Sequence, residues 1–295
     1  MIGIITKALS GFYYVAFEQE ILECKARGSF RKSGISPLVG DKVEFEKTGE
    51  DKGVINEILP RKNSICRPPV ANIDKLFIVS SHSSPAPNAY LIDKMTVIAE
   101  YNEIEPIIVF NKCDMGDFSE WEKIYNNAGF KTYTVSALNS EGVNSLKAEL
   151  KDCVSAFTGN SGVGKSSLLN TLFEREVITT GEISEKLGRG RHTTRHTELY
   201  SLAFGGFVVD TPGFSSFEID NQDYSIKENL EYLFKEFDAF IGGCRFSSCT
   251  HTKESGCAVI EAVNNGKIEE SRHNSYLRIF EELKDLKPWE AKKNK

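Results

Sequence analysis

The stretch Gly159–Ser166, which reads GNSGVGKS, decides the fold of the central part of this chain. It follows the apolar run Val154–Phe157 and leads into Ser166–Phe173, whose spacing predicts a helix. A glycine-rich turn between a buried strand and a helix turns backbone N–H groups and the helix N-terminus toward a phosphate group. We therefore expect a phosphate-binding loop in an α/β domain, with Lys165 at the outer phosphates and Ser166 holding Mg²⁺.

A second motif, Asn111-Lys112-Cys113-Asp114, follows the apolar run Ile107–Phe110 and indicates which base is bound. The Asp114 carboxylate can accept the N1–H and N2–H₂ hydrogens of guanine. Adenine lacks these hydrogens and would leave the carboxylate unpaired, which is heavily penalised. This motif favours GTP over ATP and argues against an ATP-dependent kinase.

The neighbours of Asp114 have supporting roles in this interpretation. The Lys112 stem can pack on the base, and Asn111 can tie neighbouring loops together. Ser136-Ala137 follows the strand expected at Thr132–Val135 and would support the base, with the Ala137 N–H directed at its O6 atom.

The order of these motifs along the chain is unusual. In most GTPases the phosphate loop comes first and the base-reading motif comes late. Here Asn111–Asp114 and Ser136-Ala137 precede Gly159–Ser166, and Asp210-Thr211-Pro212-Gly213 comes last. A circular permutation explains this order. It also predicts that the chain after Gly213 leads out of the domain, so that γ-phosphate contacts change the angle between the two ends of the molecule.

The residues around the γ-phosphate are expected in two segments. Gly188–His196 is basic, glycine-rich and hydroxyl-rich, and it fits a first switch that closes over Mg²⁺ through Thr193 or Thr194, with Thr194 preferred. Asp210 fits the second shell of Mg²⁺, and the Gly213 N–H fits a contact to the γ-phosphate.

The group that orients the attacking water is missing from its usual place. Many GTPases have a glutamine after the Asp-x-x-Gly motif, and Phe214 occupies that position here. Unaided hydrolysis should therefore be slow. Two interpretations of His192 stay open: a catalytic group that docks when a partner binds, and a histidine that is exposed or faces RNA.

Cysteine spacing indicates a metal site near the C-terminus. Three thiols and an imidazole lie within fourteen residues, at Cys244, Cys249, His251 and Cys257. This is a closed tetrahedral set for one structural Zn²⁺, with no position left open for catalysis. The segment around it has little apolar material with which to fold by itself, so metal binding would supply much of its stability.

The chain divides into three expected domains. Short strands separated by glycines predict an oligonucleotide-binding (OB) type β-barrel at 1–67. Pro68-Pro69 marks an expected linker. Alternating strands and helices predict the circularly permuted GTPase α/β domain at 68–218, and 219–295 is expected to be the zinc-binding helical domain. Its helices are expected at Asn229–Phe240, Ala258–Val263 and Ser275–Leu286. Lys25, Arg27, Arg31 and Lys32 gather around one turn of the barrel, where they form either a solvated hairpin or a contact to RNA phosphates.

Composition limits the remaining possibilities. The 295 residues are 40% hydrophobic and carry a net charge of −6, so any RNA contact should be local. No apolar run approaches the ~18 residues that a membrane span needs, and Met1–Lys7 lacks the charged and long apolar regions typical of a secretion signal. We expect a cytoplasmic protein that contacts no membrane, and a monomer because nothing demands oligomerisation.

With these motifs in place, the chain resembles the bacterial ribosome small-subunit-dependent GTPase A family over essentially its whole length. The resemblance implies the OB-type barrel, the permuted GTPase core and the zinc-bearing helical domain. It also implies a role in late maturation of the small ribosomal subunit, with its 16S rRNA as partner and GTP hydrolysis stimulated by that subunit. His192 matches the histidine proposed as catalytic in the family. Arg195 departs from a threonine that is frequent in relatives, which leaves the register of the switch threonine open.

Two other functions are kept as alternatives. A permuted GTPase of large-subunit assembly shares the core but usually lacks the zinc cluster. A zinc-and-barrel RNA-binding protein with a regulatory nucleotide site is disfavoured by the intact Lys165, Ser166 and Asp210. The residues expected to bind GTP are Asn111, Lys112, Asp114, Ser136, Ala137, Gly159, Asn160, Ser161, Gly162, Val163, Gly164, Lys165, Ser166, Ser167, Thr193, Thr194, Asp210 and Gly213, with Ser166, Thr194 and Asp210 around Mg²⁺.

Overall fold

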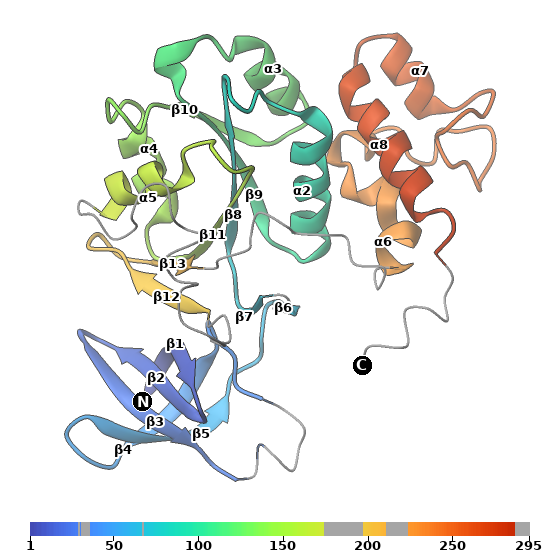
Figure 1. The fold of residues 1–295 in the computed structure, drawn as a ribbon. Helices are drawn as coiled ribbons and strands as arrows, with labels where there is room; N and C mark the ends of the chain where they lie inside the picture. The colour runs from blue at the N-terminus through green and yellow to red at the C-terminus, as the bar shows by residue number, and fades with distance from the viewer. Residues whose placement is uncertain (29, 31–35, 67, 174–196, 211–223, 287–295) are drawn as a thin grey trace.

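The computed structural model describes residues 1–28, 30, 36–66, 68–173, 197–210 and 224–286. Figure 1 shows a small barrel that carries the N-terminus, a central sheet with helices on both faces, and a group of C-terminal helices on one side of that sheet. The expected α/β multidomain architecture with an amino-terminal barrel is confirmed.

Five strands form the barrel, and alternation of apolar and polar residues explains how they close. Val43 and Phe45 are buried while their neighbours in the strand are exposed. The strands are joined in the order β1-β2-β3-β5-β4, and a further pairing of β4 with β1 closes the barrel. They are β1 (Ile2–Leu9), β2 (Phe12–Phe17), β3 (Glu20–Ala26), β4 (Lys42–Lys47) and β5 (Lys52–Ile58).

The central sheet has the strand order β10-β9-β8-β11-β13-β12. All neighbouring strands are parallel except β12, which runs antiparallel to β13. The inner strands are near-continuous apolar runs because helices cover both faces. The strands are β8 (Lys75–Ser81), β9 (Glu105–Asn111), β10 (Lys131–Val135), β11 (Val154–Thr158), β12 (Glu198–Ser201) and β13 (Phe207–Asp210).

Two pairs of helices cover the two faces of the sheet (Figure 1). Helices α2 (Ala89–Tyr101) and α3 (Ser119–Asn127) pack on one face, with Ile92 and Tyr125 in its core. Helices α4 (Val143–Leu150) and α5 (Lys165–Phe173) pack on the other. Asn88 caps α2, because its side chain accepts a hydrogen bond of 3.2 Å from the Leu91 N–H.

The barrel is connected to the sheet in two places. The hairpin of β6 (Ser64–Cys66) and β7 (Pro69–Ala71) occupies the expected linker, and it bridges to the barrel where Val39 meets Val70. Strand β1 also pairs with the edge strand β12, opposite Glu198. One eleven-stranded sheet therefore runs through both parts of the molecule.

The C-terminal unit, here residues 224–286, differs from the predicted secondary structure. Asn229–Phe240 was expected to be one helix. Instead α6 (Tyr224–Asn229) is followed by the 3₁₀ turns η3 (Leu230–Leu233) and η4 (Lys235–Phe237). Phe234 between them has an extended backbone (φ −104°, ψ 89°), which interrupts the helix and buries its ring against Tyr276.

Two longer helices complete the C-terminal unit. They are α7 (Ala258–Asn264) and α8 (Glu270–Leu283), and α8 begins five residues earlier than Ser275, where the sequence predicted it. Among the described helices, none is both long and apolar enough to cross a membrane.

Candidate nucleotide and metal sites

The phosphate loop lies where the sequence predicts it, between β11 and α5. Gly159, Gly162 and Gly164 have φ angles of 141°, 86° and 90°, which L side chains rarely adopt. A Cβ at Gly159 would also collide with the carbonyl oxygen of Val79, and one at Gly164 with the Asn111 side chain. Glycine is therefore required at both ends of the loop.

Lys165 begins α5, and its side chain folds back over the loop. Its Nζ donates hydrogen bonds to the carbonyl oxygens of Gly159 at 2.5 Å and Asn160 at 2.9 Å. Burial lowers the pKa of Lys165, because desolvation disfavours the charged ammonium. A phosphate bound at this ammonium would offset that desolvation.

Asn111 joins the phosphate loop to the base-reading loops. It ends β9 almost fully buried, and its Nδ2 donates to the carbonyl oxygen of Val163 at 2.9 Å. Its Oδ1 accepts a hydrogen bond of 3.1 Å from the Ala137 N–H. One amide side chain thereby fixes three loops at the carboxyl ends of β9, β10 and β11.

Lys112, the next residue in the chain, also connects its loop to the phosphate loop. It adopts the left-handed conformation (φ 65°, ψ 43°), which is uncommon for a residue with a side chain and here begins the 3₁₀ turn η1 (Cys113–Met115). Its Nζ donates to the carbonyl oxygen of Gly162 at 2.8 Å. The base-reading loop is thus fastened to the phosphate loop twice.

Asp114 and Ser136, both predicted to contact the base, lie side by side. The Ser136 hydroxyl is buried and donates to Asp114 Oδ1 at 2.5 Å, while Asp114 itself is exposed. The bond holds the carboxylate in place and leaves Oδ2 for another donor. The Ala137 N–H, which the sequence assigns to guanine O6, donates here to Asn111, so a base oxygen at that amide would share its hydrogen.

The remaining residues that the sequence assigns to the nucleotide fall into two groups. Ser161, Ser166 and Ser167 lie in the loop and the first turn of α5. Asp210 ends β13 at the same edge of the sheet as the phosphate loop, since β13 is parallel to β11. His192, Thr193, Thr194 and Gly213 lie outside the described residues, as do Arg31 and Lys32 of the basic barrel cluster.

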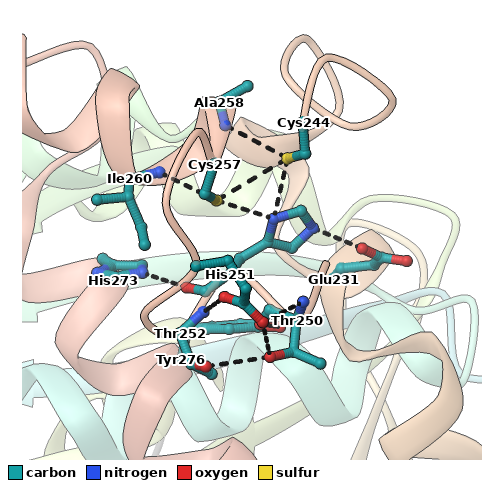
Figure 2. A network of polar contacts seen from close by, with 11 residues as sticks. Glu231, Cys244, Thr250, His251, Thr252, Cys257, Ala258, Ile260, His273 and Tyr276 are labelled. Carbon is teal, nitrogen blue, oxygen red and sulfur yellow. Dashed lines mark hydrogen bonds and ion pairs between the residues drawn. The ribbon is translucent and has the colours of Figure 1, made fainter. Parts of the chain in front are cut away.

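The four predicted metal ligands converge in the C-terminal unit. The ligand atoms of Cys244, Cys249, His251 and Cys257 all lie within 4.8 Å of one another. His251 Nδ1 is 3.3 Å from Cys257 Sγ and 3.6 Å from Cys244 Sγ. Figure 2 shows the imidazole directed at these two sulfurs.

Backbone amides support the sulfurs. The Ala258 N–H lies 3.3 Å from Cys244 Sγ, and the Ile260 N–H lies 3.5 Å from Cys257 Sγ, which caps α7 (Figure 2). Burial raises the pKa of the Cys249 thiol to about 12, so thiolates at this place need a nearby cation. The donor set, its closeness and these N–H···S contacts fit a tetrahedral metal ion.

Glu231 is a residue of this site that the sequence analysis missed. Its Oε2 lies 2.6 Å from His251 Nε2, on the side of the ring away from the sulfurs (Figure 2). A carboxylate on the second ring nitrogen fixes the tautomer in which Nδ1 is free to bind a metal. Glu231 lies twenty positions before His251 in η3, so no local spacing signals it.

The comparisons with known proteins agree with this geometry. A family model described as RsgA GTPase matches residues 58–220, and another described as RsgA N-terminal domain matches residues 2–55. The chain belongs to the RsgA GTPase family. It is accordingly a GTP hydrolase, and the resemblance found in the sequence is confirmed.

Two relatives named small ribosomal subunit biogenesis GTPase RsgA match nearly the full length of this family member. The protein of Caldanaerobacter subterraneus is 51% identical over 286 residues, which is 96% of each chain. That of Ruminiclostridium cellulolyticum is 44% identical over 300 residues, covering 99% of this chain and 97% of the relative.

Two solved structures share the fold. YjeQ from Thermotoga maritima is 38% identical, with a TM-score of 0.83, and the match covers 97% of this chain and 99% of that one. YloQ, described as a circularly permuted GTPase, is 34% identical with a TM-score of 0.81 over 97% and 96% of the two chains. The permutation inferred from motif order is confirmed.

Proposed function

We propose that this GTPase binds the small ribosomal subunit and acts in its late maturation, and that the subunit stimulates GTP hydrolysis. The observation that carries the proposal is the connection of the phosphate and base-reading loops through Asn111, which builds a guanine-nucleotide site in a chain whose relatives bear small-subunit biogenesis names. The 16S rRNA surface of that subunit is the partner, and the protein acts in the cytoplasm as a monomer.

The nucleotide site works in this proposal by position and charge. Asp114, held by Ser136, reads the guanine edge, and Lys165 meets the outer phosphates. Mg²⁺, when bound through Ser166, Thr194 and the second-shell Asp210, would neutralise phosphate charge. The Gly213 N–H would contact the γ-phosphate.

Slow unaided hydrolysis follows from Phe214, which cannot orient water. His192 is the candidate for the missing group, brought into place by the subunit. A partner of this kind can raise GTPase rates by up to ~10⁵-fold.

The proposal keeps the three domains 1–67, 68–218 and 219–295. It assigns subunit binding to the first and the third, which flank the GTPase domain. The barrel contacts RNA locally. One structural Zn²⁺ held by Cys244, Cys249, His251 and Cys257 maintains the C-terminal unit, and Glu231 orients the histidine.

The test is GTP turnover by the purified protein alone, with small subunits and with large subunits, using ATP as the control nucleotide. We expect strong stimulation by small subunits only and no turnover of ATP. Stimulation by large subunits instead would move the function to large-subunit assembly. Turnover that no subunit changes would refute the proposed partner. The same assay with His192→Ala decides the role of His192: an undiminished stimulated rate would remove it from the mechanism.

A further inference from the structure

Helix α2 is shared by the GTPase sheet and the C-terminal unit. It lies between them in Figure 1. Ile92 and Ala99 belong to the core that covers the sheet, whereas Val97 is fully buried in the core of the C-terminal unit. A displacement of α8 against α2 would therefore also change how α2 packs on the sheet.

Arg272 of α8 fixes this arrangement from within. Its side chain is completely buried, and its Nη1 donates to Asp93 Oδ1 at 2.6 Å and to Thr96 Oγ1 at 3.3 Å, both on α2. Its Nε and Nη2 donate to the two carboxylate oxygens of Glu236 at 2.6 and 3.1 Å. The guanidinium also lies over the Phe234 ring, 4.7 Å from its centroid.

Such a network is a poor source of net stability. Burying a guanidinium with two carboxylates carries a large desolvation penalty, and apolar residues of the same volume often stabilise a fold as well or better. A buried ion network does fix the relative positions of the elements that carry it, because a small slip breaks charged hydrogen bonds. Arg272 therefore sets the position of α2 against α8.

The first turns of α2 reach the phosphate loop. A cavity of about 60 Å³ lies between them, lined by Asn88, Leu91, Ile92 and Met95 of α2 and by Thr158, Gly159, Asn160 and Val163 around the loop. Across it, the Thr158 hydroxyl lies 3.8 Å from Met95 Sδ. Asp93, the partner of Arg272, sits between the cavity-lining residues Ile92 and Met95.

The two sides of the phosphate loop are held differently. Asn111 and Lys112 fasten one side with direct hydrogen bonds. On the α2 side lie the cavity and the contact between Thr158 and the Met95 sulfur. Close packing transmits a displacement, whereas groups on either side of a void can move separately. Coupling between α2 and the loop is therefore expected through the Thr158–Met95 contact, which spans the cavity.

We propose that Arg272 is a positioning residue through which the C-terminal unit controls the phosphate loop by way of α2. This rests on the proposed function in one respect, since a subunit bound to the C-terminal unit would use the same route. Displacement of α8 moves Asp93, Asp93 moves the first turns of α2, and Met95 changes the support beneath Thr158 and Gly159.

The first experiment uses the free full-length protein and measures release of a fluorescent GDP analogue. Arg272→Lys keeps the charge but loses the bidentate contact to Glu236, and Met95→Ala removes the contact to Thr158. We expect each to change the release rate at least threefold. When Met95 is already alanine, Arg272→Lys should change the release rate by less than half as much as it does in the unmodified protein, because both residues act through one helix.

Glu282→Gln is the matched control. Glu282 joins the same two helices at their exposed rim, where it accepts a hydrogen bond of 2.5 Å from the Tyr90 hydroxyl and pairs with Lys94. We expect release at the unmodified rate. Glu236→Gln, which keeps an acceptor beside Arg272, replaces Arg272→Lys if the latter does not fold.

Two results would overturn the proposal. One is an unchanged release rate in a folded Arg272 or Glu236 variant. The other is independent, multiplicative effects of Arg272→Lys and Met95→Ala. A second arm measures turnover with and without small subunits, where Arg272→Lys should cut the stimulation factor at least tenfold. An unchanged stimulation factor would contradict the route from a bound subunit through Arg272. If the unmodified protein shows no stimulation, the proposed function fails, and the GDP-release cycle still decides the role of Arg272.

Discussion

The GTPase sheet has two neighbours, and the two joints are built in opposite ways. The C-terminal unit docks on α2 through a fully buried arginine and an apolar core that includes Val97. The barrel meets the sheet at its edge, where β1 pairs with β12 and Lys7 bridges to Glu198 at 2.8 Å with both side chains about one-third exposed. A second attachment runs through the β6–β7 hairpin.

The difference shows which neighbour each γ-phosphate segment can act on in a permuted GTPase. From motif order, the segment Asp210–Gly213 was expected to act as a second switch on the zinc-bearing part, because the chain runs directly from one into the other. In space, that part packs on α2, which is remote from Asp210 in sequence. The barrel is the neighbour that pairs with β12, the strand that follows the first-switch segment in the chain. The following measurements compare how strongly each of the two neighbours is attached to the sheet.

Metal removal should produce the largest effect and would separate the two neighbours most clearly. We expect Cys257→Ala to abolish metal binding and to cost on the order of 10 kcal/mol in the C-terminal unit. Hydrogen exchange should show protection lost in 224–286 and kept in 1–58. Cys153→Ser, outside the cluster, is the control that should retain both metal and protection. Retained protection of 224–286 in Cys257→Ala would mean that packing on α2 suffices without metal.

Breaking the buried Arg272 network between α8 and α2 should have the next largest effect on stability. We expect Arg272→Met to lower the free energy of unfolding by about 3–5 kcal/mol, because Asp93 and Glu236 would stay buried without their cation. Denaturant unfolding measures the loss. Arg278→Met, an exposed arginine of the same helix that stacks on Tyr90, should lose less than about 1 kcal/mol. Equal losses for the two arginines would show that burial does not distinguish them.

The hairpin attachment of the barrel should rank third. Arg61 donates to both oxygens of Asp41 at 2.7 and 2.9 Å, and the Asp41 carboxylate is completely buried. We expect Arg61→Met to cost about 2–3 kcal/mol, since one buried charge loses its partner. The double variant Asp41→Asn, Arg61→Met should recover part of this lost stability, which thermal unfolding measures. No recovery would mean that Arg61 acts through its other contact, the Ser36 carbonyl oxygen.

The edge attachment should be the weakest. A partly exposed ion pair is worth about 0–1 kcal/mol, so Lys7→Met should barely change thermal unfolding, and the small change should shrink further as salt is raised. The Lys7→Met/Glu198→Gln double-variant cycle isolates the pair. A coupling above about 2 kcal/mol would contradict this ranking and make the two joints comparable.

The sequence predicted the parts of the molecule that depend on short spacing. Gly159–Ser166 between a strand and a helix specifies a phosphate loop because the turn and the helix N-terminus are local. The ligands Cys244 to Cys257 converge because fourteen residues can close around one ion. The central strands were also correct, since a run buried on both faces has a distinct composition. The prediction of one helix over Asn229–Phe240 was wrong, because apolar residues three or four apart suit repeated 3₁₀ turns as well as one helix.

By itself, then, the sequence determined the guanine-nucleotide motifs, their permuted order and the metal-ligand set. Only the tertiary structure decided that Arg272 meets Asp93 across 179 positions, that Glu231 faces His251, and that one face of α2 belongs to the C-terminal unit. The physical reason is that periodicity reports whether a side chain is buried but not by what. The partner of a buried group is chosen by the path of the whole chain.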